Sequence, residues 1–194
     1  MLTQRNAFFA GAFALTFAAI TPFAHAQQGN QGNTANSDAQ LQQSDEEMTP
    51  ANFVDGASAI NMGELDAAEM ALDEDKDVPP EVKQVAQKIQ QDHTQANQKL
   101  KQIAESKDLD MSATANMTSM SSAPKLMVED GKSFAADFAK LQVNAHKEAI
   151  AFFERASNEL QDQELKQYAT NALPKLKEHL QMAQDLQQKF SDGN

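Results

Sequence analysis

Three histidines are the side chains whose type and spacing point to chemistry in this sequence: His93, His146 and His179. Each falls where a helical pattern expects a core residue. His93 lies in the middle of an apolar stripe with spacings of three and four, formed by Val82, Ala86, Ile89, Ala96, Leu100 and Ile103. A buried imidazole without a polar partner costs on the order of 1–3 kcal/mol. Each of these rings therefore needs a hydrogen-bond partner or a ligand.

The distribution of these histidines is compatible with a metal site. One lies near the middle of each of three predicted helices, and Glu64 is the polar residue on the inner face of a fourth. Because the midpoints of aligned helices share a level in a bundle, the four side chains are expected to meet in the core. Nitrogen-rich ligation favours zinc, copper, nickel or ferrous iron over magnesium or calcium. The sequence predicts a transition-metal site formed by His93, His146, His179 and Glu64.

Two alternatives to this site remain open at the level of sequence. Buried histidines can instead bridge helices through hydrogen bonds to carboxylates, and Asp92, Glu64 and Glu178 are available for such a structural network. Soft thioether ligands for cuprous ions also occur, although methionine is an ordinary gap-filling residue. The four candidate methionines follow the second predicted helix: Met111, Met117, Met120 and Met127.

Familiar catalytic patterns are absent from the sequence. Di-iron proteins of the ferritin type carry Glu-x-x-His on two helices, whereas Gln90, Val143 and Leu176 stand three positions before the histidines. The absence of cysteine excludes disulfides, thiolate metal sites and cysteine nucleophiles. No Ser-His-Asp motif and no glycine-rich phosphate loop occurs. A catalytic activity is therefore not expected.

Four amphipathic helices are predicted to position the histidines. The first begins at Thr49 and Pro50 and ends near the run DEDKD, and the others cover about residues 80–106, 133–157 and 163–190. Short connections make the first and last pairs antiparallel, whereas residues 107–132 are long enough to return the chain to the other end. The predicted fold class is therefore all-α, a ferritin-like four-helix bundle with a long crossover between its second and third helices.

The N-terminal residues differ in composition from the predicted bundle, residues 49–190. Residues 1–26 combine Arg5, an apolar run and Ala24-His25-Ala26, which is typical of a signal peptide cleaved after Ala26. Residues 27–48 are rich in Gln, Asn, Ser and Gly and are predicted to form a disordered tether. We therefore expect a periplasmic or secreted protein, with no membrane span in its mature chain. Its net charge of −12 argues against nucleic acid as a partner.

Several stretches resemble one known family. They are FVDGASAINMGELDAAEMAL, VPPEVKQVAQKIQQDHTQANQKLKQIA, NAHKEAIAFFERAS and LPKLKEHLQMAQDL. Residues 51–188 resemble an uncharacterised bacterial family of ferritin-like secreted proteins, a domain of unknown function often labelled "predicted outer membrane protein". The pair Asp92-His93 and the run from Leu173 to His179 carry the resemblance most specifically. It implies a ferritin-like fold and an envelope location, with no established reaction. The protein partner and oligomeric state stay open.

The sequence departs from this family at two places. The family's third helix usually opens with Phe-Asp-x-x-Tyr, where this chain has Phe134, Ala135 and Phe138. A second Asp-His pair is also usual, and here Ala145 precedes His146. Roles that the resemblance would give to those polar groups are therefore not carried over to this chain.

Overall fold

The computed structural model describes residues 47–115 and 123–191, which form helices α1 (Pro50–Leu72), α2 (Pro80–Ser106), α3 (Ala123–Val128), α4 (Gly131–Glu159) and α5 (Gln163–Ser191). No strand occurs among these residues, so the predicted all-α class is confirmed. The predicted signal peptide and most of the predicted tether lie outside the described residues. Within the described part, none of the helices is both long and apolar enough to cross a membrane.

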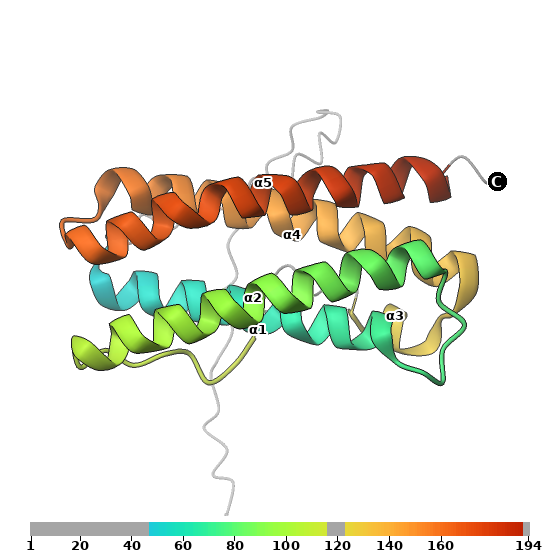
Figure 1. Ribbon diagram of the computed structural model, residues 1–194, viewed down its shortest axis with the longest axis horizontal. Helices are drawn as coiled ribbons and strands as arrows, with labels where there is room; N and C mark the ends of the chain where they lie inside the picture. The colour runs from blue at the N-terminus through green and yellow to red at the C-terminus, as the bar shows by residue number, and fades with distance from the viewer. Residues whose placement is uncertain (1–46, 116–122, 192–194) are drawn as a thin grey trace, which may run out of the picture. The chain divides into compact units, whose positions relative to one another are not determined.

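The four long helices pack lengthwise as two hairpins. The hairpin of α1 and α2 lies beside the hairpin of α4 and α5, with α2 against α5 and α1 against α4 (Figure 1). The N–H of Gly131, at the start of α4, donates to the carbonyl of Asp77 in the α1–α2 turn at 2.6 Å. At the other end, Lys107 after α2 pairs with Asp162 before α5 at 2.9 Å. Helices α2 and α4 therefore run in the same direction, as the predicted crossover requires.

The start of α1 is fixed by local sequence. Thr49 is the N-cap residue, and its hydroxyl accepts a hydrogen bond from the Asn52 N–H at 3.1 Å. Met48, which the sequence analysis placed in the tether, is buried in the same apolar cluster as Phe53. These two residues hold the N′ and N4 positions that a hydrophobic staple joins, so the folded unit begins before the predicted boundary at residue 49.

The short helix α3 lies in a segment where no helix was predicted. Its Leu126 is fully buried, and the Lys76 ammonium donates to the carbonyls of Leu126, Met127 and Glu129 at 2.9–3.0 Å. A lysine from the α1–α2 turn thus satisfies carbonyls that end this helix. Prediction from local periodicity missed α3 because these contacts are long-range.

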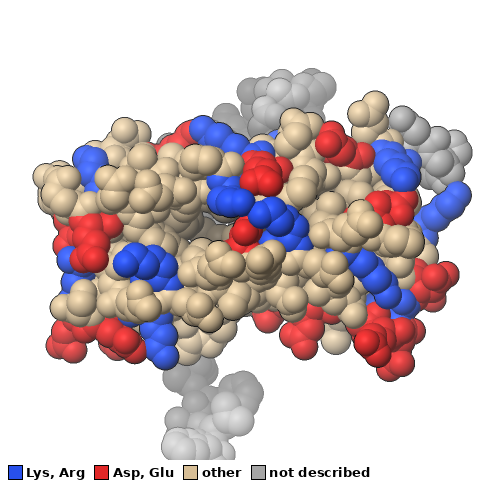
Figure 2. Space-filling view, in the orientation of Figure 1, with Lys and Arg blue, Asp and Glu red and all other residues tan. Residues whose placement is uncertain are grey.

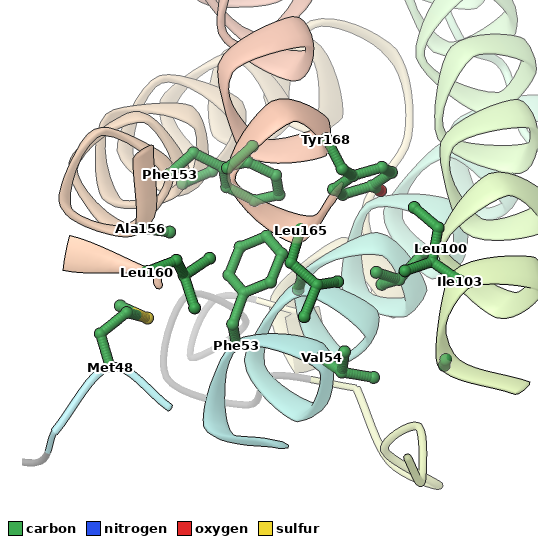
Figure 3. Packing of buried hydrophobic residues seen from close by; sticks show 14 of the residues in the cluster. Met48, Phe53, Val54, Leu100, Ile103, Phe153, Ala156, Leu160, Leu165 and Tyr168 are labelled. Atoms are coloured by element: carbon green, nitrogen blue, oxygen red, sulfur yellow. The ribbon is translucent and has the colours of Figure 1, made fainter. Parts of the chain in front are cut away.

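The core consists of two apolar clusters separated by a polar layer. The first contains Phe53, whose ring packs edge-on against Phe153 at 5.5 Å (Figure 3). The Phe53 ring also stacks with Phe152 at 5.7 Å. The second cluster contains Phe134 and Phe138 near the start of α4. Between them along the long helices lie buried polar residues: Ser58, Asn61, Glu64, His93, Gln142, His146 and His179.

A glycine permits close packing of α1 and α4 next to the first cluster. A Cβ atom at Gly56 would lie 2.6 Å from Cζ of Phe152, which is closer than such atoms approach in proteins. The Phe152 ring therefore packs on the bare backbone of α1. This contact and the Phe53 stack hold the α4 side of the bundle against α1 at one end of the polar layer.

Candidate metal centre

The structure brings the three histidines together in the polar layer. His93 of α2, His146 of α4 and His179 of α5 are each at most 3% exposed. One ring nitrogen from each lies within 4.8 Å of the others, and their ring centroids are 5.2–5.8 Å apart. The closest pair is Nε2 of His146 and Nδ1 of His179, at 3.3 Å. The convergence expected from helix midpoints is therefore present.

These spacings suit a small metal ion. Zinc binds imidazole nitrogens at about 2.0–2.1 Å, so two nitrogens on one tetrahedral ion lie about 3.3–3.4 Å apart. The nitrogens of His146 and His179 already have this separation. His93 would need to approach by at most roughly 1.5 Å, given the 4.8 Å limit. Small rotations of one ring about its side-chain torsions provide a movement of this size.

One nitrogen of each histidine ring faces an oxygen. We call this the outer nitrogen and the other one the inner nitrogen. His93 Nδ1 lies 3.0 Å from Asn61 Oδ1, His146 Nδ1 lies 3.0 Å from its own helix's Gln142 carbonyl, and His179 Nε2 lies 2.9 Å from Asp92 Oδ2. Because these oxygens only accept hydrogen bonds, each outer nitrogen carries the hydrogen. The same arrangement orients metal-bound histidines in proteins, and it leaves the second nitrogen of each ring with a lone pair.

The inner nitrogens are consequently three acceptors with no donor between them. His93 Nε2 is buried and has no hydrogen-bond partner among the described residues. His146 Nε2 and His179 Nδ1 face each other, lone pair to lone pair, at 3.3 Å. A proton or a cation at this position would remove the repulsion and satisfy the buried nitrogens.

The pKa shifts of His93 and His179 favour the neutral form of these two rings. Burial holds the pKa of His93 well below its usual range, and the nearby His146 and His179 lower it further, against a smaller opposing effect of Asp92. Burial likewise lowers the pKa of His179, although Asp92 opposes it. Both rings are thus neutral at physiological pH, which is the form that binds metal ions.

Glu64 lies beside this cluster and is not one of the three converging groups. Its Oε1 is 3.5 Å from Nδ1 of His146, which is the outer nitrogen of that ring. Burial raises the pKa of Glu64, and His146 and Gln142 partly offset this. Glu64 therefore lies behind His146, next to its outer nitrogen, whereas the sequence predicted it as a fourth metal ligand.

Of the carboxylates named for a structural network, Asp92 contacts a histidine, as that alternative requires, and Glu178 pairs with a lysine instead. Asp92 contacts His179 and also pairs with Lys88 at 2.7 Å. Burial raises the pKa of Asp92, but hydrogen bonds from Lys88 and His179 outweigh this effect and hold the pKa below its usual value. Glu178 instead pairs with Lys175 at the surface.

The methionines do not form a site among the described residues. Met111 packs partly buried against the first apolar cluster, and Met127 is 66% exposed. Met117 and Met120 lie outside the described residues. The proposed copper site in this segment therefore gains no support from the two methionines that are described.

The sequence analysis did not predict Asn61 or the pocket that reaches the histidines. Asn61 stands three positions before Glu64, so the two share a helix face, and this spacing was an available signal. A pocket of about 550 Å³ opens between α2 and α5, and its lining includes Asn61, His93 and His179. Figure 2 shows this face, with lysine side chains beside the hollow between the two helices.

Fold and site together define an all-α helical bundle with a buried three-histidine cluster that could hold a metal ion. Residues 33–186 match the family described as a domain of unknown function, DUF4142, and the chain belongs to this family. The family is uncharacterised, as the resemblance implied. Neither the curated proteins nor the solved structures contain a match to this chain.

Proposed function

We propose that this protein binds one transition-metal ion per chain at His93, His146 and His179. The observation that carries the proposal is the hydrogen-bond pattern of the rings. Their outer nitrogens face oxygen atoms, so their inner nitrogens converge as lone pairs without a donor. Three neutral nitrogen ligands favour zinc, copper, nickel or ferrous iron. Asp92 and Glu64 act behind the ligands, where such carboxylates raise the basicity of a bound imidazole.

The proposal includes a ferritin-like bundle as the scaffold. Its support is the direction of the chain, since α2 and α4 run parallel and the connection between them joins opposite ends of the helices (Figure 1). The Glu-x-x-His pairs of di-iron proteins are absent. We therefore assign a metal-binding or stress-protective role and no ferroxidase chemistry.

A purely structural role for the histidines is the second candidate. It is favoured by the hydrogen bonds that already connect helices, from His93 to Asn61 of α1 and from His179 to Asp92 of α2. In that case the rings would contribute to stability without any ion. The pair of acceptor nitrogens at 3.3 Å is less easily explained in this way, because it brings two lone pairs together.

Equilibrium dialysis distinguishes these two functions. Metal-free protein dialysed against zinc is expected to retain one ion per chain, because one set of three nitrogens is present. Substitution of either His93 or His179 by alanine is expected to remove this retention. Zinc bound equally by the wild type and both variants would instead indicate adventitious binding to surface carboxylates, and the structural role would stand.

We also propose that the protein works in the bacterial envelope. The support is the sequence of residues 1–26, with Arg5, the apolar run and Ala24-His25-Ala26. The mature chain is then expected to begin at Gln27. The intact mass of protein recovered from the envelope fraction checks this expectation, and a mass that retains Met1 would contradict it.

A further inference from the structure

The pocket between α2 and α5 gives the histidine cluster access to small molecules. Its volume of about 550 Å³ lies within the usual range for small-molecule sites. His93 and His179 line it, and His93 carries the buried nitrogen that lacks a hydrogen-bond partner. Three protein ligands leave the fourth position of a tetrahedral ion open, as in catalytic zinc sites. A molecule in the pocket would reach this position.

The walls of the pocket are apolar. Ile103 contributes from α2, Phe153 from α4 and Leu176 from α5, and the small side chains of Ala96 and Ala172 leave room between the helices. The phenol of Tyr168 donates its hydrogen to the Ala96 carbonyl at 3.1 Å, so its polar atom is already satisfied. An occupant with an apolar body would therefore fit these walls.

The charges around the pocket favour an anionic head group. Lys99 and Lys175 line it, and the lining carboxylates of Asp92 and Glu164 pair with lysines. Lys175 already pairs with Asp92 and Glu178, whereas Lys99 forms no ion pair among the described residues. Three neutral imidazoles do not compensate the charge of a divalent ion. An anion that binds the ion meets attraction both from the metal and from the lysines.

We propose that this pocket binds a small monocarboxylic acid with an apolar body, whose carboxylate completes the coordination of the metal ion. The inference rests on the proposed metal site and adds the class of its ligand. The apolar body lies between Ala96 of α2 and Ala172 of α5. The carboxylate occupies the position that the three histidines leave open.

Cobalt(II) tests this inference, because its visible spectrum responds to a change in the fourth ligand. Benzoate added to the cobalt-loaded full chain is expected to shift the spectrum with saturation. Acetate, which has the head group alone, should give a similar shift at about tenfold higher concentration or more, since it buries little apolar surface. Benzyl alcohol, which has the body without the anion, should give no shift.

A variant that fills the pocket provides the control. Ala172→Phe is expected to weaken benzoate binding by about tenfold or more and to leave the cobalt spectrum and the acetate response unchanged. Ala96→Leu, on the opposite wall, repeats the test if Ala172→Phe does not fold. Ala151→Phe, at an exposed position on α4, should bind benzoate like the wild type.

The possible failures are distinguishable. A histidine-dependent cobalt spectrum that does not respond to benzoate would overturn the inference and leave the metal site intact. Equal affinities for benzoate and acetate, or benzoate binding unaffected by both pocket-filling variants, would also overturn it. The absence of any histidine-dependent cobalt spectrum would overturn both the inference and the proposed function.

Discussion

Zinc is expected to raise the melting temperature of the metal-free protein by roughly 5–11 °C when the free ion is at about 100 times its dissociation constant. An ion that binds only the folded chain at that concentration stabilises it by about 2.7 kcal/mol. For a domain of this size each kcal/mol corresponds to about 2–4 °C. His93→Ala is expected to abolish the increase, because it removes a nitrogen that converges with those of His146 and His179. Differential scanning calorimetry measures the melting temperatures of the wild type and of His93→Ala.

The comparison is between melting temperatures with and without zinc for each variant. The cavity left by His93→Ala lowers stability in both conditions, so it cancels in this difference. Asn97→Ala, one turn further along α2, is the matched control and should keep the full increase. An increase that persists in His93→Ala would show that zinc binds elsewhere, and the three-histidine site would be rejected.

Asp92→Ala is expected to weaken zinc binding by about 10–100-fold while the protein stays folded. The carboxylate accepts the outer hydrogen of His179 at 2.9 Å, so it fixes the orientation of the ring and strengthens its inner nitrogen as a ligand. Loss of such a partner typically reduces metal affinity by this factor. Competition with a chelator of known affinity gives the two dissociation constants.

Lys88→Ala separates this effect from a general loss of charge pairing. Lys88 forms an ion pair with the same carboxylate at 2.7 Å, whereas the hydrogen bond to His179 comes from Asp92 itself. Its removal should leave zinc affinity within a few-fold of the wild type, because a partly exposed ion pair contributes little. Equal losses in the two variants would contradict a specific role of the Asp92–His179 hydrogen bond.

Local sequence predicted most of the helices. The predicted range 80–106 agrees with α2, and the predicted start at Thr49 agrees with its observed role as N-cap. Helix α4 begins at Gly131, before the predicted residue 133. Gly131 adopts a positive φ of 57°, which glycine permits, and its N–H bonds to Asp77 in a distant turn. Contacts of this kind do not follow from periodicity within one segment.

Only part of the candidate site could be predicted from the sequence. The three histidines converge because each lies at the middle of its helix, and the midpoints of helices with level ends lie side by side in a bundle. The role of each neighbour depends on how a helix is rotated about its axis, which sequence does not specify. Asn61 of α1 therefore faces His93, whereas Glu64, one turn later, contacts the outer side of His146. The pocket depends on the packing of α2 against α5 and had no signal in either helix alone.

The polar layer joins two helical hairpins that are distant in sequence. Asn61 and His93 belong to the hairpin of α1 and α2, and His146 and His179 to that of α4 and α5. Contacts within each hairpin close short loops and form quickly, whereas docking of the hairpins joins residues that are far apart in the sequence and is slower. Because the three inner nitrogens meet only after docking, an ion would bind the docked chain alone. The metal-free chain would still fold, and the ion would add to the free energy that holds the two docked hairpins together.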